Sequence, residues 1–168
     1  MAKKTLDDLQ QLYYEELKDI YDAEHQILEA LPKLEKAAGS KDLKEAFREH
    51  REQTEEQVDR LERVFESLGQ EPKRKACKGM KGLIEEGSEF VEAKGEPAAI
   101  DAALIASAQR VEHYEISAYG TLRTFAEALG LEDQAELLQE TLEEEEDADE
   151  RLSEIAEAGV NELAGVRE

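Results

Sequence analysis

Four long segments of this 168-residue chain carry apolar residues at every third or fourth position, which is the spacing of one face of an α-helix. No segment has the strict alternation of apolar and polar residues that is typical of a half-buried strand. Thr5 and Ser40 are expected N-caps, and Gly39, Gly69 and Gly130 follow expected helix ends. The sequence therefore predicts an all-α protein with helices over about 5–38, 41–68, 97–129 and 132–158.

The connections between these segments predict how the helices are arranged. Because only a short turn at Gly39 and Ser40 separates the first two helices, we expect them to be antiparallel neighbours, and the same holds for the last two around Gly130. Residues 70–97 are too poor in apolar side chains to fold alone, so they are expected to form a crossover carrying a short helix over about 83–93. This order indicates a single domain over 1–168, a ferritin-like antiparallel four-helix bundle with one long crossover between helices 2 and 3. A coiled-coil rod is the competing interpretation, but the two glycine-ended hairpins would fold such a rod back on itself.

The charge of the chain argues against two classes of partner. Charged residues make up 38% of the sequence and the formal net charge is −22 at pH 7. A nucleic-acid partner needs Lys and Arg to replace the counterions of its phosphates, so we expect no nucleic acid, and for the same reason no binding to an anionic membrane. Much of this acidity is expected to lie on a solvated helix surface, where it favours solubility.

The single cysteine and the N-terminal residues bear on disulfides, metal ligands and localisation. Cys77 is the single cysteine, so no intramolecular disulfide and no cysteine-based metal site is expected. No apolar stretch follows Met1, and no segment has the length and apolarity of a membrane span. We therefore expect a cytoplasmic protein without a membrane partner.

Four ionisable side chains interrupt the apolar faces of the four long helices. They are Glu24, His50, Glu115 and Glu145, one on each helix. An isolated buried carboxylate costs several kcal/mol unless another group compensates its charge. Because four such side chains are expected to converge inside one bundle, a bound pair of metal ions is the compensating group that the pattern favours.

The distances of these residues from the helix turns predict that they lie at one level of the bundle. Glu24 precedes Gly39 by 15 residues, and His50 and Thr54 follow it by 11 and 15, while Glu115 and Glu145 each lie 15 residues from Gly130. With a rise of about 1.5 Å per residue, each hairpin brings its pair to a similar height.

Two flanking carboxylates can add to this ligand set. Glu112 lies one turn before Glu115, and Asp149 lies one turn after Glu145. Carboxylates at this spacing share a helix face and can reach one ion or two adjacent ions. Iron is the expected metal, with manganese or zinc as alternatives. The alternative to a metal is a buried polar network in which His50 and Thr54 pair with carboxyl groups that retain protons.

Several segments of the chain resemble the YciE/YciF family of ferritin-like stress proteins. They are residues 21–32, which begin Tyr-Asp-Ala-Glu24, the His50-x-x-x-Thr54 spacing, and residues 80–85, 111–116, 119–122 and 140–145. The similarity extends over essentially the whole chain. It implies a ferritin-like four-helix subunit with a dinuclear iron site, an association with bacterial stress, and a homodimer. The Glu112-x-x-Glu115 spacing is also similar to the third-helix pair of rubrerythrin-type sites.

The chain departs from the wider di-iron pattern at two positions. That pattern has Glu-x-x-His on the second and fourth helices, whereas here Phe47 precedes His50 and Ala148 follows Glu145 at this spacing. A site with fewer ligands is expected to bind metal less tightly and to leave coordination positions open. Two functions follow as expectations: a metal-binding stress protein with slow peroxide-consuming activity, or a non-enzymatic bundle that sequesters metal or serves a structural role.

Overall fold

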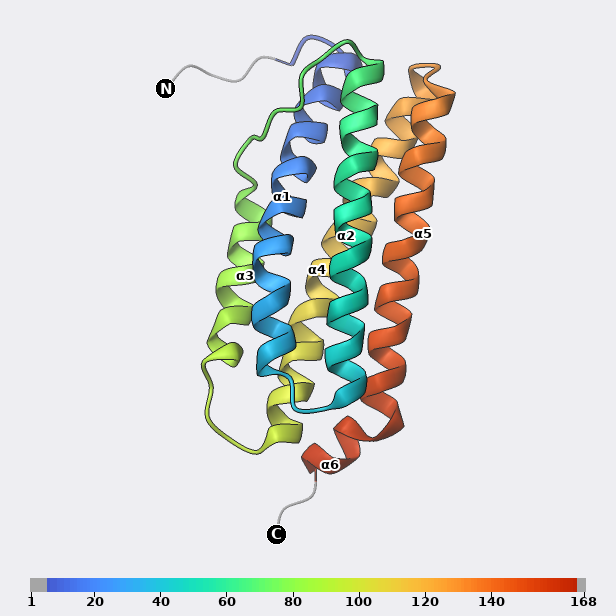
Figure 1. The fold of residues 1–168 in the computed structure, drawn as a ribbon. Coiled ribbons are helices and arrows are strands. Elements are labelled where there is room, and N and C mark those ends of the chain that lie inside the picture. The colour runs from blue at the N-terminus through green and yellow to red at the C-terminus, as the bar shows by residue number, and fades with distance from the viewer. Residues whose placement is uncertain (1–5, 166–168) are drawn as a thin grey trace.

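The structure, a computed structural model, describes residues 6–165 and is all-helical in that range, as predicted. Figure 1 shows four long helices lying side by side, with a shorter helix against one side of them. None of the helices in the described range is both long enough and apolar enough to cross a membrane. The helices are α1 (Leu9–Ala37), α2 (Lys41–Ser67), α3 (Lys78–Val91), α4 (Pro97–Ala128), α5 (Glu132–Ile155) and α6 (Asn161–Gly165), with a π-helical turn at Ala156–Val160.

The long helices form two antiparallel hairpins, α1 with α2 and α4 with α5 (Figure 1). The segment between α2 and α4 runs back along the outside of the bundle, and α3 within it packs on α1 and α4. The sequence predicts this helix over about 83–93, whereas α3 begins earlier, at Lys78. The earlier start has a local cause, because the Cys77 side chain accepts a hydrogen bond from the backbone N–H of Met80 and caps the helix.

Helix ends in the described range follow the local signals of the sequence with small shifts. Ser40 caps α2 by accepting a hydrogen bond from the N–H of Leu43, and Pro97 is the first residue of α4. The predicted cap Thr5 lies outside the described residues, and Asp8 caps α1 instead. Gly130 has a φ of 71°, a left-handed conformation that glycine adopts without steric cost, and it allows the tight turn into α5.

The C-terminal part of the last long helix differs from the prediction. Its predicted end was about residue 158, but α5 ends at Ile155 and passes into the π-helical turn. The chain then bends at Gly159 into the short helix α6. The difference arises because a helical sequence pattern continues past the point where the backbone changes direction.

The core consists of the apolar faces of the four long helices. Its largest fully buried side chains include Tyr13 and Leu17 of α1, Phe65 of α2 and Tyr119 of α4. Aromatic rings pack edge to face at the α1–α2 contact, where Tyr21 and Phe65 have ring centroids 5.5 Å apart. Among the described residues only Leu6 and Leu163 are large apolar side chains with high exposure.

A buried carboxylate ties the first hairpin turn to the other half of the bundle. Asp101 of α4 accepts hydrogen bonds from the backbone N–H groups of Gly39 and Ser40, at 2.7 and 2.8 Å. These N–H groups lie in the turn between α1 and α2 and would otherwise lack partners in the protein. The contact therefore sets where the turn lies on α4.

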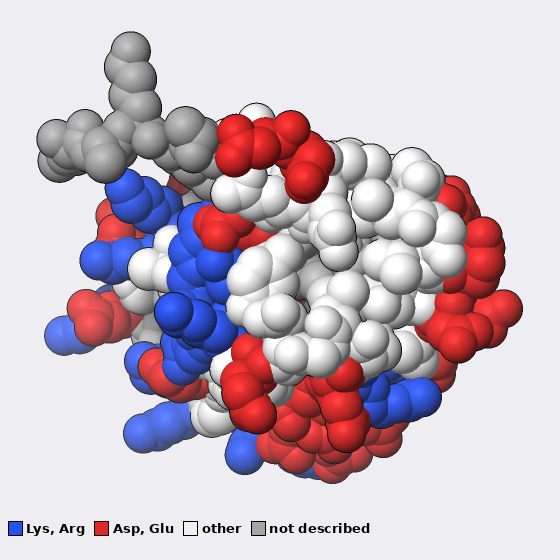
Figure 2. All heavy atoms as spheres, turned by 90° about the horizontal axis from the view of Figure 1, so that it is seen from above, with Lys and Arg blue, Asp and Glu red and all other residues white. Residues whose placement is uncertain are grey.

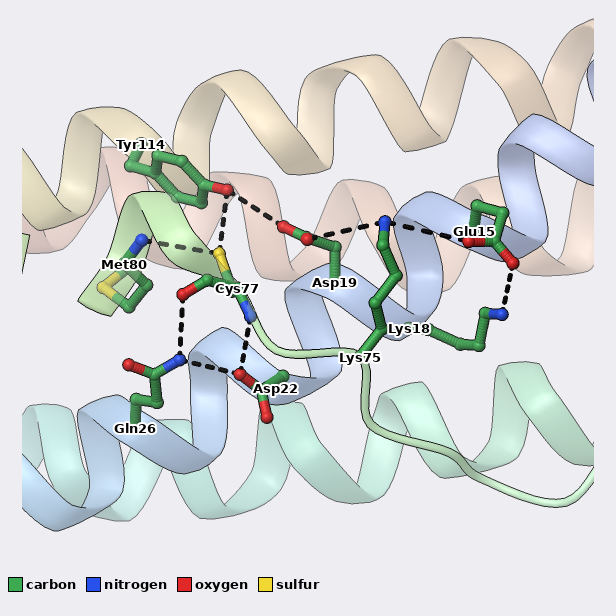
Figure 3. A network of polar contacts seen from close by, with 9 residues as sticks. All are labelled: Glu15, Lys18, Asp19, Asp22, Gln26, Lys75, Cys77, Met80 and Tyr114. Carbon is green, nitrogen blue, oxygen red and sulfur yellow. Dashed lines mark hydrogen bonds and ion pairs between the residues drawn. The ribbon is translucent and has the colours of Figure 1, made fainter. Parts of the chain in front are cut away.

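A second buried carboxylate, Asp22 of α1, holds the crossover against the bundle (Figure 3). It accepts hydrogen bonds from the N–H of Cys77 at 2.8 Å, from Gln26 at 2.7 Å and from Arg74 at 2.8 Å. Burial alone would raise the pKa of Asp22, but these hydrogen bonds and the charge of Arg74 more than offset it, so the pKa lies below its usual value.

The same segment is also held through Tyr114 of α4. Its hydroxyl donates to Asp19 at 3.1 Å and lies 3.0 Å from the Cys77 sulfur (Figure 3). The Tyr114 ring lies so close to Gly79 that a Cβ there would be 2.7 Å from ring atom Cε2. Glycine at this position therefore allows the start of α3 to approach α4.

Charges are unevenly distributed around the bundle. Viewed along its axis, Lys and Arg side chains gather toward one side (Figure 2), the side on which α3 and the crossover lie in Figure 1. The crossover carries Lys73, Arg74, Lys75 and Lys78. Part of this charge pairs with α1, since the Lys75 ammonium lies 3.7 Å from Asp19 and 3.8 Å from Glu15.

We expect Asp22→Ala to lower the free energy of unfolding by about 2–3 kcal/mol, because it leaves the buried N–H of Cys77 without its partner. Urea unfolding followed by circular dichroism measures this change. Asp147→Ala is the matched control: Asp147 is exposed on α5, so its removal should change stability by no more than about 0.5 kcal/mol. Equal effects of the two substitutions would contradict the role given to Asp22.

Candidate metal centre

Five of the six residues singled out from the sequence lie together in the middle of the bundle. His50, Glu112, Glu115 and Glu145 each offer one nitrogen or oxygen atom, and these atoms all lie within 4.8 Å of one another. Glu24 adjoins them, and its carboxyl group and that of Glu115 shift each other's pKa. All five side chains are buried, although four of them ionise readily in water.

Each long helix contributes to this group because of where the residue falls in its apolar face. Glu24 comes from α1, His50 from α2 and Glu145 from α5, while α4 provides both Glu112 and Glu115. Residues three positions apart on a helix lie on one face, so the two α4 carboxylates project in the same direction. The bundle thus brings together side chains that are up to 121 residues apart in the sequence.

His50 lies between two of the carboxylates. Its Nε2 is 3.4 Å from Oε1 of Glu112 and 3.9 Å from Oε2 of Glu145. Thr54, one turn further along α2, donates its hydroxyl to the backbone carbonyl of His50 at 2.8 Å. The Thr54 hydroxyl is therefore engaged by the backbone and does not compensate the carboxylates.

Tyr119 is a neighbour of the site that was not among the candidate ligands predicted from the sequence. Its hydroxyl donates a hydrogen bond to Oε1 of Glu24, and its ring is fully buried. The sequence holds a weak signal for this contact, because Tyr119 lies four positions after Glu115 and thus on the same face of α4. The bond engages one oxygen of Glu24, while Oε2 has no hydrogen-bond partner.

Asp149 is the singled-out residue that lies apart from the group. It is partly exposed, and its carboxylate lies 3.2 Å from the amide nitrogen of Gln109 and 3.5 Å from Nε2 of His113. One turn of α5 separates it from Glu145, and over that turn the helix surface passes from the bundle interior toward solvent. His113 is exposed.

Burial raises the pKa of all four clustered carboxyl groups. The pKa of Glu24 rises to about 7, although the hydrogen bond from Tyr119 acts in the opposite direction, and that of Glu112 rises to about 8. For Glu115 and Glu145 burial is again the largest cause, and neighbouring carboxylates raise the pKa further, well above the usual value. Without a cation, the site therefore retains protons at neutral pH.

The polar atoms of this group are largely without partners. Of eleven buried side-chain nitrogen and oxygen atoms that lack a hydrogen bond in the described range, eight belong to the five residues. They are Oε2 of Glu24, both ring nitrogens of His50, Oε2 of Glu112, and both carboxyl oxygens of Glu115 and Glu145. Buried polar atoms in folded proteins are almost always paired, so this concentration fits a group of ligands for a bound cation.

Comparison with known proteins gives matches over nearly the whole chain. A family model described as "Domain of unknown function (DUF892)" matches residues 8–165. Protein YciF of Escherichia coli (strain K12) is 46% identical over 165 residues, which is 98% of each chain.

Solved structures agree with these sequence matches. The crystal structure of the E. coli stress protein YciF has a TM-score of 0.89 at 44% identity, covering 93% of this chain and 99% of that one. YcfI from Rhodopseudomonas palustris has a TM-score of 0.87 at 40% identity, covering 91% of this chain and 98% of that one. A protein from Xanthomonas campestris, at 20% identity and a TM-score of 0.74, shares the fold, covering 95% of this chain and 100% of that one. These matches confirm the resemblance indicated by the sequence motifs: the chain belongs to the DUF892 family and is a relative of the E. coli stress protein YciF.

Proposed function

We propose that this protein is a ferritin-like metal-binding protein of the stress response, with two iron ions held by Glu24, His50, Glu112, Glu115 and Glu145. The observation that carries the proposal is the set of eight buried ligand atoms without hydrogen-bond partners. Oxygen and imidazole donors without thiolate suit iron, with manganese and zinc as alternatives. The homodimer implied by the family resemblance is part of the same proposal.

The donors divide into two carboxylate pairs. Glu24 and Glu115 shift each other's pKa, and so do Glu112 and Glu145. Two divalent cations that displace the protons of these groups would have their charge balanced by the four carboxylates. His50 would add a nitrogen ligand. Tyr119, by engaging one oxygen of Glu24, limits how that carboxylate can turn and leaves Oε2 for a metal.

The departures from the di-iron pattern coincide with free space. Phe47 and Ala148, which occupy the positions of the absent Glu and His ligands, line a small cavity of about 30 Å³ that also touches His50 and Glu112. A space of this size accommodates a single water molecule. This supports a site in which a small oxygen ligand takes the place of a protein side chain.

Iron held by these residues would supply one-electron redox chemistry toward peroxide. The contribution of the protein is to hold the ligands in a dry environment and to admit a small oxygen compound beside His50 and Glu112. Because two protein ligands of the wider pattern are absent, we propose slow peroxide consumption. The stress association of the E. coli relative supports this assignment.

A non-enzymatic structural role is the second candidate. The raised pKa values of the carboxyl groups favour it, because these groups can be neutralised by protons without any metal. A structural role has also been suggested for the R. palustris relative. The two candidates differ in how the stability of the protein responds to metal.

Metal binding should raise the melting temperature of the wild-type protein by about 5–10 °C at a free metal concentration of about 100 times the dissociation constant. Glu115→Gln should abolish most of this rise, because it removes a ligand, yet the metal-free variant should melt higher than metal-free wild type. The neutral amide removes a buried charge that the metal-free protein has to neutralise. Differential scanning calorimetry with Fe(II) under anaerobic conditions, with Mn(II), and with chelator measures both changes.

Glu146→Gln is the matched control for this experiment. Glu146 is the exposed neighbour of Glu145 on α5, so its substitution should leave the metal-dependent rise intact. If wild type melts at the same temperature with metal and with chelator, the metal proposal fails and the structural role stands.

The pH dependence of stability should have opposite signs with and without metal. In the presence of chelator the folded pKa values of Glu24 and Glu112, about 7 and about 8, exceed the usual value of 4.5. The native state then binds more protons than the unfolded chain, so stability is greatest at acidic pH and falls as pH rises toward about 8. With metal, the stabilisation should grow over the same range, because the ion competes with fewer protons. Melting curves from pH 5 to pH 9 test both signs.

Peroxide consumption is tested by loading the protein anaerobically with Fe(II) and adding hydrogen peroxide in a stopped-flow instrument. Iron in the wild type should oxidise faster than free Fe(II), and iron presented to Glu115→Gln should oxidise at the rate of free Fe(II). Bound iron that oxidises no faster than free Fe(II) would exclude the redox activity while leaving metal binding in place.

A further inference from the structure

A second, larger cavity of about 260 Å³ lies between α1, α3 and α4 and reaches the buried cluster. Exposed residues of its lining, Lys33 and Glu92, mark the end that faces solvent. His50 and Glu112, both buried, mark the inner end. The cavity therefore connects the protein surface beneath α3 with His50 and Glu112 of the buried cluster.

The wall of this cavity is mostly apolar. Ile27 and Leu31 come from α1, Leu83 and Val91 from α3, and Val111 from α4. Exposing such side chains to a water-filled space is unfavourable, by about 25 cal/mol per Å² of apolar surface. An apolar molecule that fills the cavity would remove this surface from water.

The position of α3 keeps the cavity open. α3 approaches α4 closely at two glycines: Gly79 lies against the ring of Tyr114, and a Cβ at Gly87 would lie 3.4 Å from the Cβ of Ser107. The hydrogen bonds of Asp22 hold the segment that leads into α3. These contacts fix the position of α3 beside the cavity, so the helix does not pack closely enough against α1 and α4 to fill it.

Three residues of the otherwise apolar wall have buried polar atoms without hydrogen-bond partners. They are the hydroxyl of Ser107, the two ring nitrogens of His50 and Oε2 of Glu112. A mostly apolar wall with a few convergent polar groups is the usual lining of a small-molecule site. The Ser107 hydroxyl supports a ligand site independently of the metal, because it is not among the proposed metal ligands and still has no hydrogen-bond partner.

From this geometry we infer that the cavity binds a small, largely apolar molecule bearing one hydroxyl group. The apolar part would lie among the side chains of α1, α3 and α4, and the polar group would reach Ser107, His50 and Glu112. At about 30 Å³ for a water-sized group, the volume holds roughly eight or nine non-hydrogen atoms. This is too small for a peptide segment, and it corresponds in size to octanol. The polar group would share His50 and Glu112 with the proposed metal site, so the inference is tested on metal-free protein.

Isothermal titration of the full chain with octanol, in the presence of chelator, tests this inference. Wild type should bind one octanol saturably. Ala30→Phe, which places a ring in the cavity from α1, should weaken binding at least about tenfold. Ala106→Phe is the matched control, because Ala106 is exposed on α4 and does not line the cavity. Absence of saturable binding by wild type, or equal affinity of wild type and Ala30→Phe, would overturn the inference.

Two further measurements locate the bound molecule. Of the three histidines, only His50 should change its imidazole resonances in NMR spectra on addition of octanol, while His25 and His113 remain unchanged. Ser107→Ala should weaken octanol binding by about 2–10-fold, the value of one hydrogen bond, and leave benzene binding unchanged. A shift at His25 or His113 in place of His50 would overturn the assignment. Because all these readouts use metal-free protein, they stand or fall separately from metal binding.

Discussion

The burial of four carboxyl groups and one imidazole at the middle of a helical bundle is the constraint on which the rest of this structure depends. Each of the four long helices carries at least one such side chain in its apolar face. The buried group contains no Lys or Arg that could pair with its carboxylates. Unpaired buried charges are strongly destabilising, so the native state needs protons or a cation at this place. The raised pKa values of the four carboxyl groups have the same cause, and they predict how stability should change with pH and with metal.

The crossover has a different physical role from the four long helices. It is held by buried hydrogen bonds to Asp22 and by the close approach of Gly79 to Tyr114, and only a few of its side chains, such as Met80, are fully buried. Because α3 is fixed by these polar and steric contacts, it covers the space between α1 and α4 without filling it. The cavity beside the cluster is a consequence of this mode of attachment, and it gives the buried site a connection to the surface.

Much of the arrangement could be predicted from residue spacing, and the failures have identifiable causes. Glu24, His50, Glu115 and Glu145 were identified because each interrupts a helical apolar face, and their similar distances from the turns predicted their common level. The same spacing rule treated Glu112 and Asp149 alike, yet Glu112 is buried in the group and Asp149 pairs with Gln109 and His113. The rule fails here because the rotation of each helix about its axis decides which flanking residue faces inward.

The sequence by itself determined the helical class, the four long helices and the residues that place charge in their apolar faces, because these follow from a 3.6-residue period and from short-range capping. It also carried the family resemblance that the comparisons confirmed. Only the tertiary structure decided that Tyr119 donates to Glu24, that Asp101 and Asp22 hold a turn and the crossover, and that a cavity reaches His50. Those contacts join residues far apart in the chain, so they depend on how the helices pack and not on any local pattern.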